Sequence, residues 1–457
     1  MISLSTGEAA CSFGDPSYAD ANLTASSPMP IRRCQSLRRT QQRTDGQART
    51  NDNNLPAERR VPRAWLDLCN GALVMQGIDE LLCATLRGEN PPWPEYGDNK
   101  FLDHFLERSA YHGVQALLYH CVADQAGVEL GWPKVILDTC RQQATAQALW
   151  EMRHQYLLNQ VLERLVAIEI HPVLFKGTAL AYDVYPAPFL RTRGDTDLIV
   201  PSDTRDRVAK ALETLGFREL GTRADVISGQ TSYSWTDPAS NQEHALDLHW
   251  RINNSTTLSN LFSYEELRSE ARPLPALGAN ALAADPVHAL VLACMHRAVH
   301  KHSPYYVDDV AYYGGDRLIW FYDIQLLFSM LSPSQRDEFV GLAERKGLRA
   351  TCLDGIEATR ARFHTTIPEA VSGALSRPGP TETASSYLSG SRLYRKWRDF
   401  QAARGVRNKS GFLTQLLFPP AIHMRQKYRQ ANLSWLPWLY LRRALAGSLK
   451  YLRSRDS

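Results

Sequence analysis

The sequence predicts an α/β protein of the α+β kind, in which a small mixed sheet is flanked by helical regions along the chain. Apolar residues recur at helical spacing before residue 170 and again after residue 285. Between these two regions, over residues 171–275, short apolar runs alternate with short helical patterns. The chain has 457 residues, of which 44% are apolar, so it exceeds one average domain and can bury a substantial core.

The two N-terminal regions differ in composition. Residues 1–62 are rich in Ser, Thr, Arg, Gln and Asn and poor in large apolar residues, a composition that cannot offset the entropy of ordering, so we expect a disordered tail. Residues 63–170 are predicted to be helical. The evidence is helical periodicity in WLDLCNGALVMQGIDELLCATL, FLDHFLERSAYHGVQALLYHCV and, most clearly, ALWEMRHQYLLNQVLERLVAI.

The core region, residues 171–275, is predicted to alternate strands and helices. Gly216 is expected to cap the second helix, and apolar and polar residues alternate in HALDLHWRI as they do in a half-buried strand. The expected elements are the strand VLF (173–175), the helix TALAYDVY (178–185), the strand DTDLIV (195–200), the helix RDRVAKALETLG (205–216), a turn and strand in SGQTSYSWTD (228–237), and the strand HALDLHWRI (244–252).

The C-terminal part is predicted to be helical again. In residues 276–390, Asp285 and Pro286 supply an N-cap and a first-turn proline for the helix VHALVLACMHRAVHKH, and RLIWFYDIQLLFSML forms a second apolar helix. Residues 391–457 are expected to form a basic helical tail, because they hold fifteen Lys or Arg against two Asp, whereas the net charge of the chain is only +4. The tail suits RNA, anionic lipid or an acidic partner, or packs on the acidic middle of its own chain.

Cysteine usage and hydropathy exclude several classes of protein. The eight cysteines form no CxxC pair, so neither a disulfide framework nor a cysteine-rich zinc site is indicated, and reduced thiols suit a cytoplasmic protein. The first residues lack the pattern of a secretory signal, and no apolar run approaches the roughly 18 to 20 residues that span a bilayer. We therefore expect a cytoplasmic protein without a transmembrane segment.

Three carboxylates on the predicted strands carry the chemistry. Asp195 and Asp197 are two residues apart on one strand and so point to the same face. Two neighbouring carboxylates repel each other, and a divalent cation removes the cost of burying them. Asp247, on a strand about fifty residues later, can align beside them, so all three are predicted to bind Mg²⁺ or possibly Mn²⁺.

A second set of residues suits a nucleotide's phosphates. Gly177 and Thr178 begin a helix directly after a strand, where free backbone N–H groups favour an anion. Lys176, Arg191 and Arg193 could neutralise triphosphate charge, or could instead balance the nearby carboxylates or face solvent.

The combination of KGTAL, RTRGDTDLIV and LDLHWRI resembles the polymerase-β-like nucleotidyltransferase superfamily, and within it a bacterial family of uncharacterised nucleotidyltransferases. The resemblance covers about residues 174–252 and extends more loosely to MHRAVH and LIWFYDIQLL. It implies a nucleotidyltransferase core at residues 171–275. It also implies that Gly177 and Thr178 contact nucleotide phosphate, while Asp195, Asp197 and Asp247 form the catalytic, metal-binding carboxylate set.

Several histidines have two interpretations. His249 shares the strand face of Asp247 and either supports the site or belongs to the core. His296 and His300 lie four residues apart on one helical face near His302, a spacing that allows zinc but fits a structural or substrate-contacting role better. Trp320 and Asp323 lie on an apolar helix and are expected to pack in the core.

We therefore expect an enzyme that transfers a nucleoside monophosphate from an NTP, such as ATP, to an unknown acceptor and releases pyrophosphate. The acceptor could be a small molecule, a protein or an RNA. Two alternatives remain open: a metal-dependent glycosyltransferase that uses a D-x-D motif, and a non-catalytic nucleotide-binding regulator.

Overall fold

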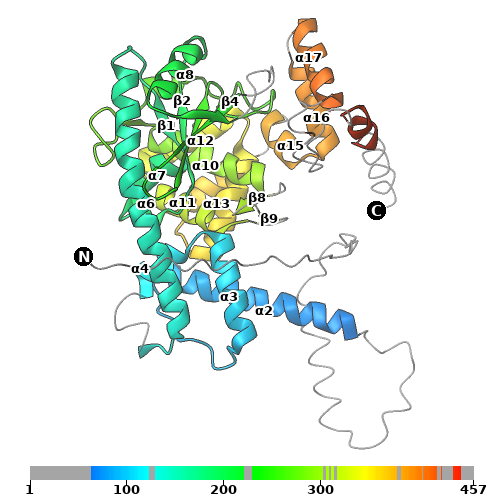
Figure 1. Cartoon of the computed structure of the whole chain (residues 1–457). Coiled ribbons are helices and arrows are strands. Elements are labelled where there is room, and N and C mark those ends of the chain that lie inside the picture. The colour runs from blue at the N-terminus through cyan, green and yellow to red at the C-terminus, as the bar shows by residue number, and fades with distance from the viewer. Residues whose placement is uncertain are drawn as a thin grey trace, which may run out of the picture. The chain divides into compact units, whose positions relative to one another are not determined.

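The strands expected between residues 171 and 252 form the middle of a mixed sheet in the computed structural model (Figure 1). The structure describes residues 63–122, 129–220, 229–301, 305–307, 310–312, 316–377, 382–403, 405–418, 424 and 436–443, so the predicted disordered tail lies outside the described residues. The chain divides into two units, Met1–Leu73 and Val74–Ser457, and the sheet belongs to the second.

The sheet has the strand order β3-β4-β5-β2-β1-β7-β6. Strand β2 pairs antiparallel with β1 and parallel with β5, and β5 pairs antiparallel with β4, so the sheet is mixed. The strands are β1 (Val173–Phe175), β2 (Asp195–Ile199), β3 (Arg218–Leu220), β4 (Gln230–Thr236), β5 (Glu243–His249), β6 (Arg272–Pro273) and β7 (Leu282–Ala283). A separate pair, β8 (Tyr305–Val307) and β9 (Val310–Tyr312), forms a small hairpin.

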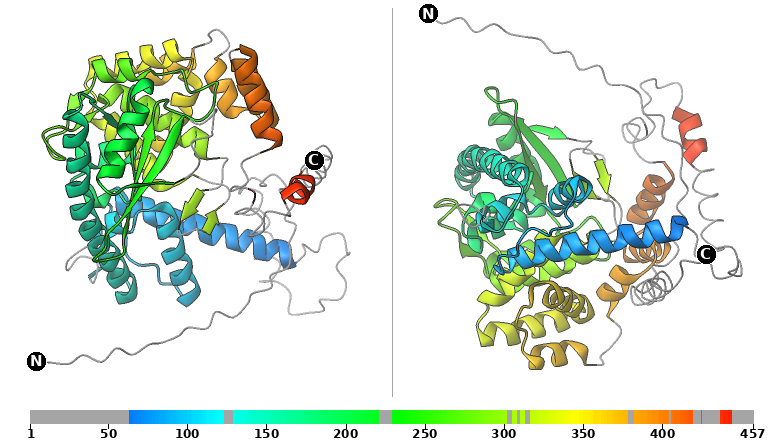
Figure 2. Two further views of the ribbon diagram at one scale, coloured as in Figure 1. Left: turned by 45° about the horizontal axis from the view of Figure 1, so that its top comes forward. Right: turned by 90° about the horizontal axis from the view of Figure 1, so that it is seen from below.

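The two faces of the sheet pack against different helices, because successive side chains of a strand point to opposite sides. Leu198 of β2 and Leu246 of β5 lie in one buried cluster together with α6 and α8. Ile199 of β2 and Phe175 of β1 lie in another, with α10 and α11. Figure 2 shows the sheet between these groups of helices.

The helices follow the predicted apolar periodicity. Asp285 caps α10 as expected, since its side chain accepts hydrogen bonds from the backbone N–H groups of Val287 and His288. The helices are α2 (Arg63–Leu86), α3 (Asn99–His112), α4 (Gln115–Val122), α6 (Lys134–Val166), α7 (Gly177–Asp183), α8 (Arg205–Thr214), α9 (Tyr264–Ser269), α10 (Pro286–His300), α11 (Leu318–Met330), α12 (Pro333–Lys346), α13 (Arg349–Phe363), α14 (Glu369–Ser376), α15 (Thr383–Ser389), α16 (Arg392–Ala402) and α17 (Gly405–Leu417).

The predicted fold class is confirmed, with differences in detail. The sheet continues past residue 275, because β7 adds a parallel neighbour to β1. Strand β5 ends at His249 rather than at residue 252, since the N–H groups of Trp250 and Arg251 both donate to the Gly229 carbonyl instead of continuing the ladder.

The basic C-terminal region begins with a helix that is tied to its own chain. Asp399 of α16 accepts hydrogen bonds from the Ser255 hydroxyl at 2.7 Å and the Tyr387 hydroxyl at 2.8 Å. This contact agrees with packing of α16 on its own chain. Among the described residues, no helix combines the length and apolar character needed to cross a membrane.

Candidate active site

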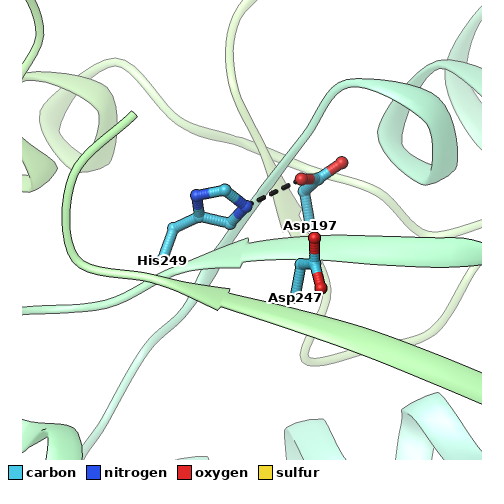
Figure 3. A group of neighbouring side chains, drawn as sticks. All are labelled: Asp197, Asp247 and His249. Atoms are coloured by element: carbon cyan, nitrogen blue, oxygen red, sulfur yellow. Dashed lines mark hydrogen bonds and ion pairs between the residues drawn. The ribbon is translucent and has the colours of Figure 1, made fainter. Parts of the chain in front are cut away.

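Two carboxylates and an imidazole meet on one face of the sheet. The parallel register of β2 and β5 places Asp197 directly opposite Asp247, and His249 lies two residues further along β5. Ligand atoms of these three side chains all lie within 4.8 Å of one another. Figure 3 shows them on the same side of the neighbouring strands.

Asp197 is buried between two basic partners. Its Oδ1 accepts hydrogen bonds from Lys176 Nζ at 2.7 Å and from His249 Nε2 at 2.8 Å. Burial alone would raise the pKa of Asp197, but Lys176 and His249 hold this pKa well below its usual range. Asp197 is therefore ionised, and its Oδ2 is the oxygen that these two partners leave for a cation.

Asp247 is held by two side chains from the adjacent strand β4. Ser232 Oγ donates to Asp247 Oδ1 at 2.6 Å, and Gln230 Nε2 donates to Oδ2 at 2.8 Å. Sequence reasoning missed both residues. Their spacing of two on a strand was the available signal, but which of their faces meets Asp247 depends on the β4–β5 register.

Asp195 begins β2 and lines the same cavity, outside the group of three. Its side chain keeps a solvent-exposed surface, yet protein atoms crowd it from the sides. This crowding first, and then the charges of Asp197 and Asp247, raise the pKa of Asp195 to about 6. Three carboxylates thus face each other with Lys176 as the nearest cation, an arrangement that favours binding of a divalent cation.

A cavity of about 380 Å³ opens in front of these carboxylates, between the sheet and the helices α10 and α11. Lys176 and Gly177 lie at one side of it, and Gln230, Asn253 and Asn254 line another part. The wall formed by α10 and α11 contributes Ala289, Leu292, Ala293, Met295, His296, Val299, His300, Trp320 and Asp323.

The turn between β1 and α7 has an unusual backbone. Lys176 adopts a positive φ of 60°, which is costly for a residue with a side chain and typically occurs at functional positions. No side chain caps the first turn of α7, and Gly177 lines the cavity. Thr178 is buried instead, and its hydroxyl contacts Thr196 Oγ1 at 2.7 Å, so any contact of Thr178 with phosphate would come from its backbone N–H.

Both predicted arginines line the cavity but are engaged in buried ion pairs. Arg191 forms a two-pronged pair with Asp323, at 3.1 Å from Nε to Oδ1 and 2.8 Å from an Nη to Oδ2. Arg193 pairs with Glu151 of α6 at 2.6 Å and also donates to the Thr178 hydroxyl. These contacts favour the interpretation in which the arginines balance nearby carboxylates, and they give Asp323 a structural partner.

His296, His300 and Trp320 meet on the opposite wall of the cavity. The centroids of the two imidazoles are 4.4 Å apart, and that of Trp320 lies 5.6 Å from His296. Among the described residues, neither histidine belongs to a group that could hold a metal ion, and His302 lies outside the described residues. The geometry favours a structural or substrate-contacting role over zinc.

A mixed sheet with facing carboxylates beside a strand–turn–helix unit is the arrangement that the resemblance to nucleotidyltransferases implies. The model of a family described as uncharacterised nucleotidyltransferases matches residues 99–364, more than half of the chain, and the chain belongs to this family. The protein is therefore an enzyme of the nucleotidyltransferase class. No curated protein matches this chain.

Proposed function

We propose that this nucleotidyltransferase transfers a nucleoside monophosphate from an NTP to an acceptor in a reaction that requires a divalent cation, Mg²⁺ or Mn²⁺. The observation that carries the proposal is the direct opposition of Asp197 and Asp247 across β2 and β5, beside Asp195 at the mouth of the cavity. Carboxylate oxygens are the ligands that these ions prefer.

The donor set fits such an ion. Asp197 is ionised, and Lys176 and His249 bind only its Oδ1. Asp247 is fixed by Ser232 and Gln230, so both carboxylates can bind a cation without rearranging the strands. When bound, the ion would supply charge neutralisation at the transferring phosphoryl group and the leaving pyrophosphate.

The chain's own residues would position the substrates. Lys176 lies beside the carboxylates and would meet the negative charge of the β- and γ-phosphates. The backbone N–H groups of Gly177 and Thr178 would contact the same phosphates. Asp247 would orient the acceptor hydroxyl, which attacks the α-phosphorus as the bond to pyrophosphate breaks and the hydroxyl proton passes to solvent water.

The decisive experiment is transfer of label from α-labelled NTPs in a cell extract, followed by separation of protein, RNA and small molecules. Label should appear in one fraction with the unmodified protein. Label transfer should fall by about 10²–10³-fold or more with Asp197→Asn or Asp247→Asn, because the divalent cation that stabilises the charge of the transition state would bind less tightly.

Asp206→Asn, an exposed substitution on α8, is the matched control and should leave transfer unchanged. Full transfer by both site variants would refute the proposal.

A further inference from the structure

One stripe of α10 forms part of the cavity wall that faces the carboxylates. Ala289, Ala293, His296 and His300 are spaced by four, three and four residues, so they share one helical face, and all four line the cavity. Trp320 of α11 joins them. The small side chains of Ala289 and Ala293 leave room beside the rings.

The three rings form one aromatic cluster in which they are tilted relative to one another, by 44° between the imidazoles and by 84° and 42° between Trp320 and His296 and His300. The imidazole centroids of His296 and His300 are 4.4 Å apart, and the Trp320 centroid lies 5.6 Å from His296 and 6.0 Å from His300. Trp320 is buried and is therefore fixed, whereas both histidines are only partly buried on the cavity side. The cluster is thus both preformed and accessible.

The two imidazoles are neutral and offer hydrogen bonds. Burial lowers the pKa of His296 well below its ordinary value and the pKa of His300 to about 4, with Lys176 contributing in both cases. Within the described residues, burial and nearby charges, rather than a hydrogen bond to the protein, account for the lowered pKa of each ring. A neutral imidazole has one N–H donor and one acceptor, so each ring can meet a polar edge.

Two charged side chains that line this part of the cavity are already engaged with other protein groups. Arg317 donates to the Tyr111 carbonyl at 2.6 Å, and Asp323 pairs with Arg191. The wall therefore suits a flat, uncharged ligand with donors and acceptors at its edge, while Lys176 and the carboxylates opposite suit phosphates and metal. A nucleoside triphosphate has these two ends.

We propose that His296, His300 and Trp320 form the nucleobase subsite of this enzyme, with the base packed against this cluster of rings and its polar edge hydrogen-bonded to the imidazoles. The proposal rests on the proposed nucleotidyl transfer, because it assigns the cavity to the NTP donor. It adds which residues recognise the part of the donor that does not react.

The test compares two probes that share phosphates and metal but differ in the base. The affinities of ATP and of inorganic tripolyphosphate, each with Ca²⁺, are measured by calorimetry on the full chain. His296→Ala and His300→Ala should weaken ATP binding about tenfold or more, within the range known for loss of base–aromatic stacking, and should change tripolyphosphate binding less than twofold.

Controls separate folding from recognition. Trp320→Phe should retain most of the ATP affinity because it keeps a ring, and His171→Ala, an exposed change outside the cavity, should alter neither probe. Retained tripolyphosphate binding shows that each variant keeps its fold.

Equal weakening of both probes, or unchanged ATP binding in both histidine variants, would overturn the base assignment while leaving the proposed function intact. Failure of the unmodified protein to bind either probe would instead count against the proposed function itself.

Discussion

The polar groups on the two faces of strand β2 have different surroundings, the cavity on one face and helix α6 on the other. On one face, Asp197 reaches the cavity, where three carboxylates share Lys176 as the nearest cation. On the other, Thr196 contacts His154 of α6 at 2.6 Å and joins a buried network with Thr178, Arg193 and Glu151, of which Arg193 also lines the cavity. Polar groups on one face of β2 thus bind other protein groups, whereas those on the other face can bind a ligand.

Charged residues near the site differ in which groups they contact. Glu151 and Arg193 are as charged as Asp197 and Lys176, but they are buried against each other and against Tyr182, whose hydroxyl donates to Glu151 at 2.7 Å. Their role is to fix α7 and β2 relative to α6. The candidate active site lies on the other face of β2, where the carboxylates outnumber the cationic side chains that contact them.

The face of β2 that packs against α6 should contribute more to stability than the face that lines the cavity. Replacing Glu151 by Gln leaves the Arg193 guanidinium buried without its counter-charge, which typically costs about 3–5 kcal/mol. The urea unfolding midpoint should fall sharply, while label transfer per folded molecule stays within about threefold. Glu163→Gln, on an exposed position of the same helix, is the control and should change neither. A Glu151→Gln protein as stable as the unmodified one would break the comparison.

The face of β2 that lines the cavity should contribute more to catalysis than the face that packs against α6. Lys176→Gln removes the cation that faces Asp197 and the substrate phosphates, so turnover should fall about 10–100-fold, or roughly 1.4–2.7 kcal/mol. Its unfolding midpoint should shift less than that of Glu151→Gln, because the Lys176 side chain is partly exposed and His249 still donates to Asp197. The measurement is label transfer beside Lys210→Gln, an exposed change on α8. Loss of stability without loss of turnover would show that Lys176 has a structural role, like the buried network around Glu151.

The smallest effect concerns pH. Burial first, and then Arg193 and His244, hold the pKa of His154 well below its ordinary value, so this ring stays neutral in the folded protein. The unfolded chain takes up a proton below about pH 6.5, so the folded state loses up to about 1.4 kcal/mol per pH unit for this histidine. Urea unfolding at pH 7, 6 and 5 should show stability decreasing toward acid, with a shallower decrease in His154→Gln. An equal slope in both proteins would remove His154 from the network.

The sequence predicted the local parts of the site and not the long-range ones. Asp195, Asp197 and Asp247 could be placed on strand faces because side chains alternate with a period of two, and the capping of α10 by Asp285 followed from adjacent residues. The pairing of Arg191 with Asp323, 132 residues away, depends on how helices pack and leaves no local signal. The same holds for Glu151 and His154, which a helical pattern alone assigns to a buried face without naming their partners.

Histidines show the boundary between these cases. The spacing of His296 and His300 predicted a shared face, yet only the packing of α10 on the sheet shows that this face borders the cavity. For His249, the strand period indicated the correct side, and the parallel register of β2 and β5 brought its ring to Asp197. Which residues share a face is local information, but what that face meets is not.

The central claim is that Asp197 and Asp247 hold a divalent cation for an NTP. It is tested most directly by measuring the affinity of ATP with Mn²⁺ and with EDTA, in the unmodified protein, in Asp247→Asn and in Asp206→Asn. Mn²⁺ should strengthen ATP binding at least about tenfold, close to 1.4 kcal/mol, in the unmodified protein and in Asp206→Asn. This enhancement should be lost in Asp247→Asn, and the same enhancement in all three proteins would contradict the claim.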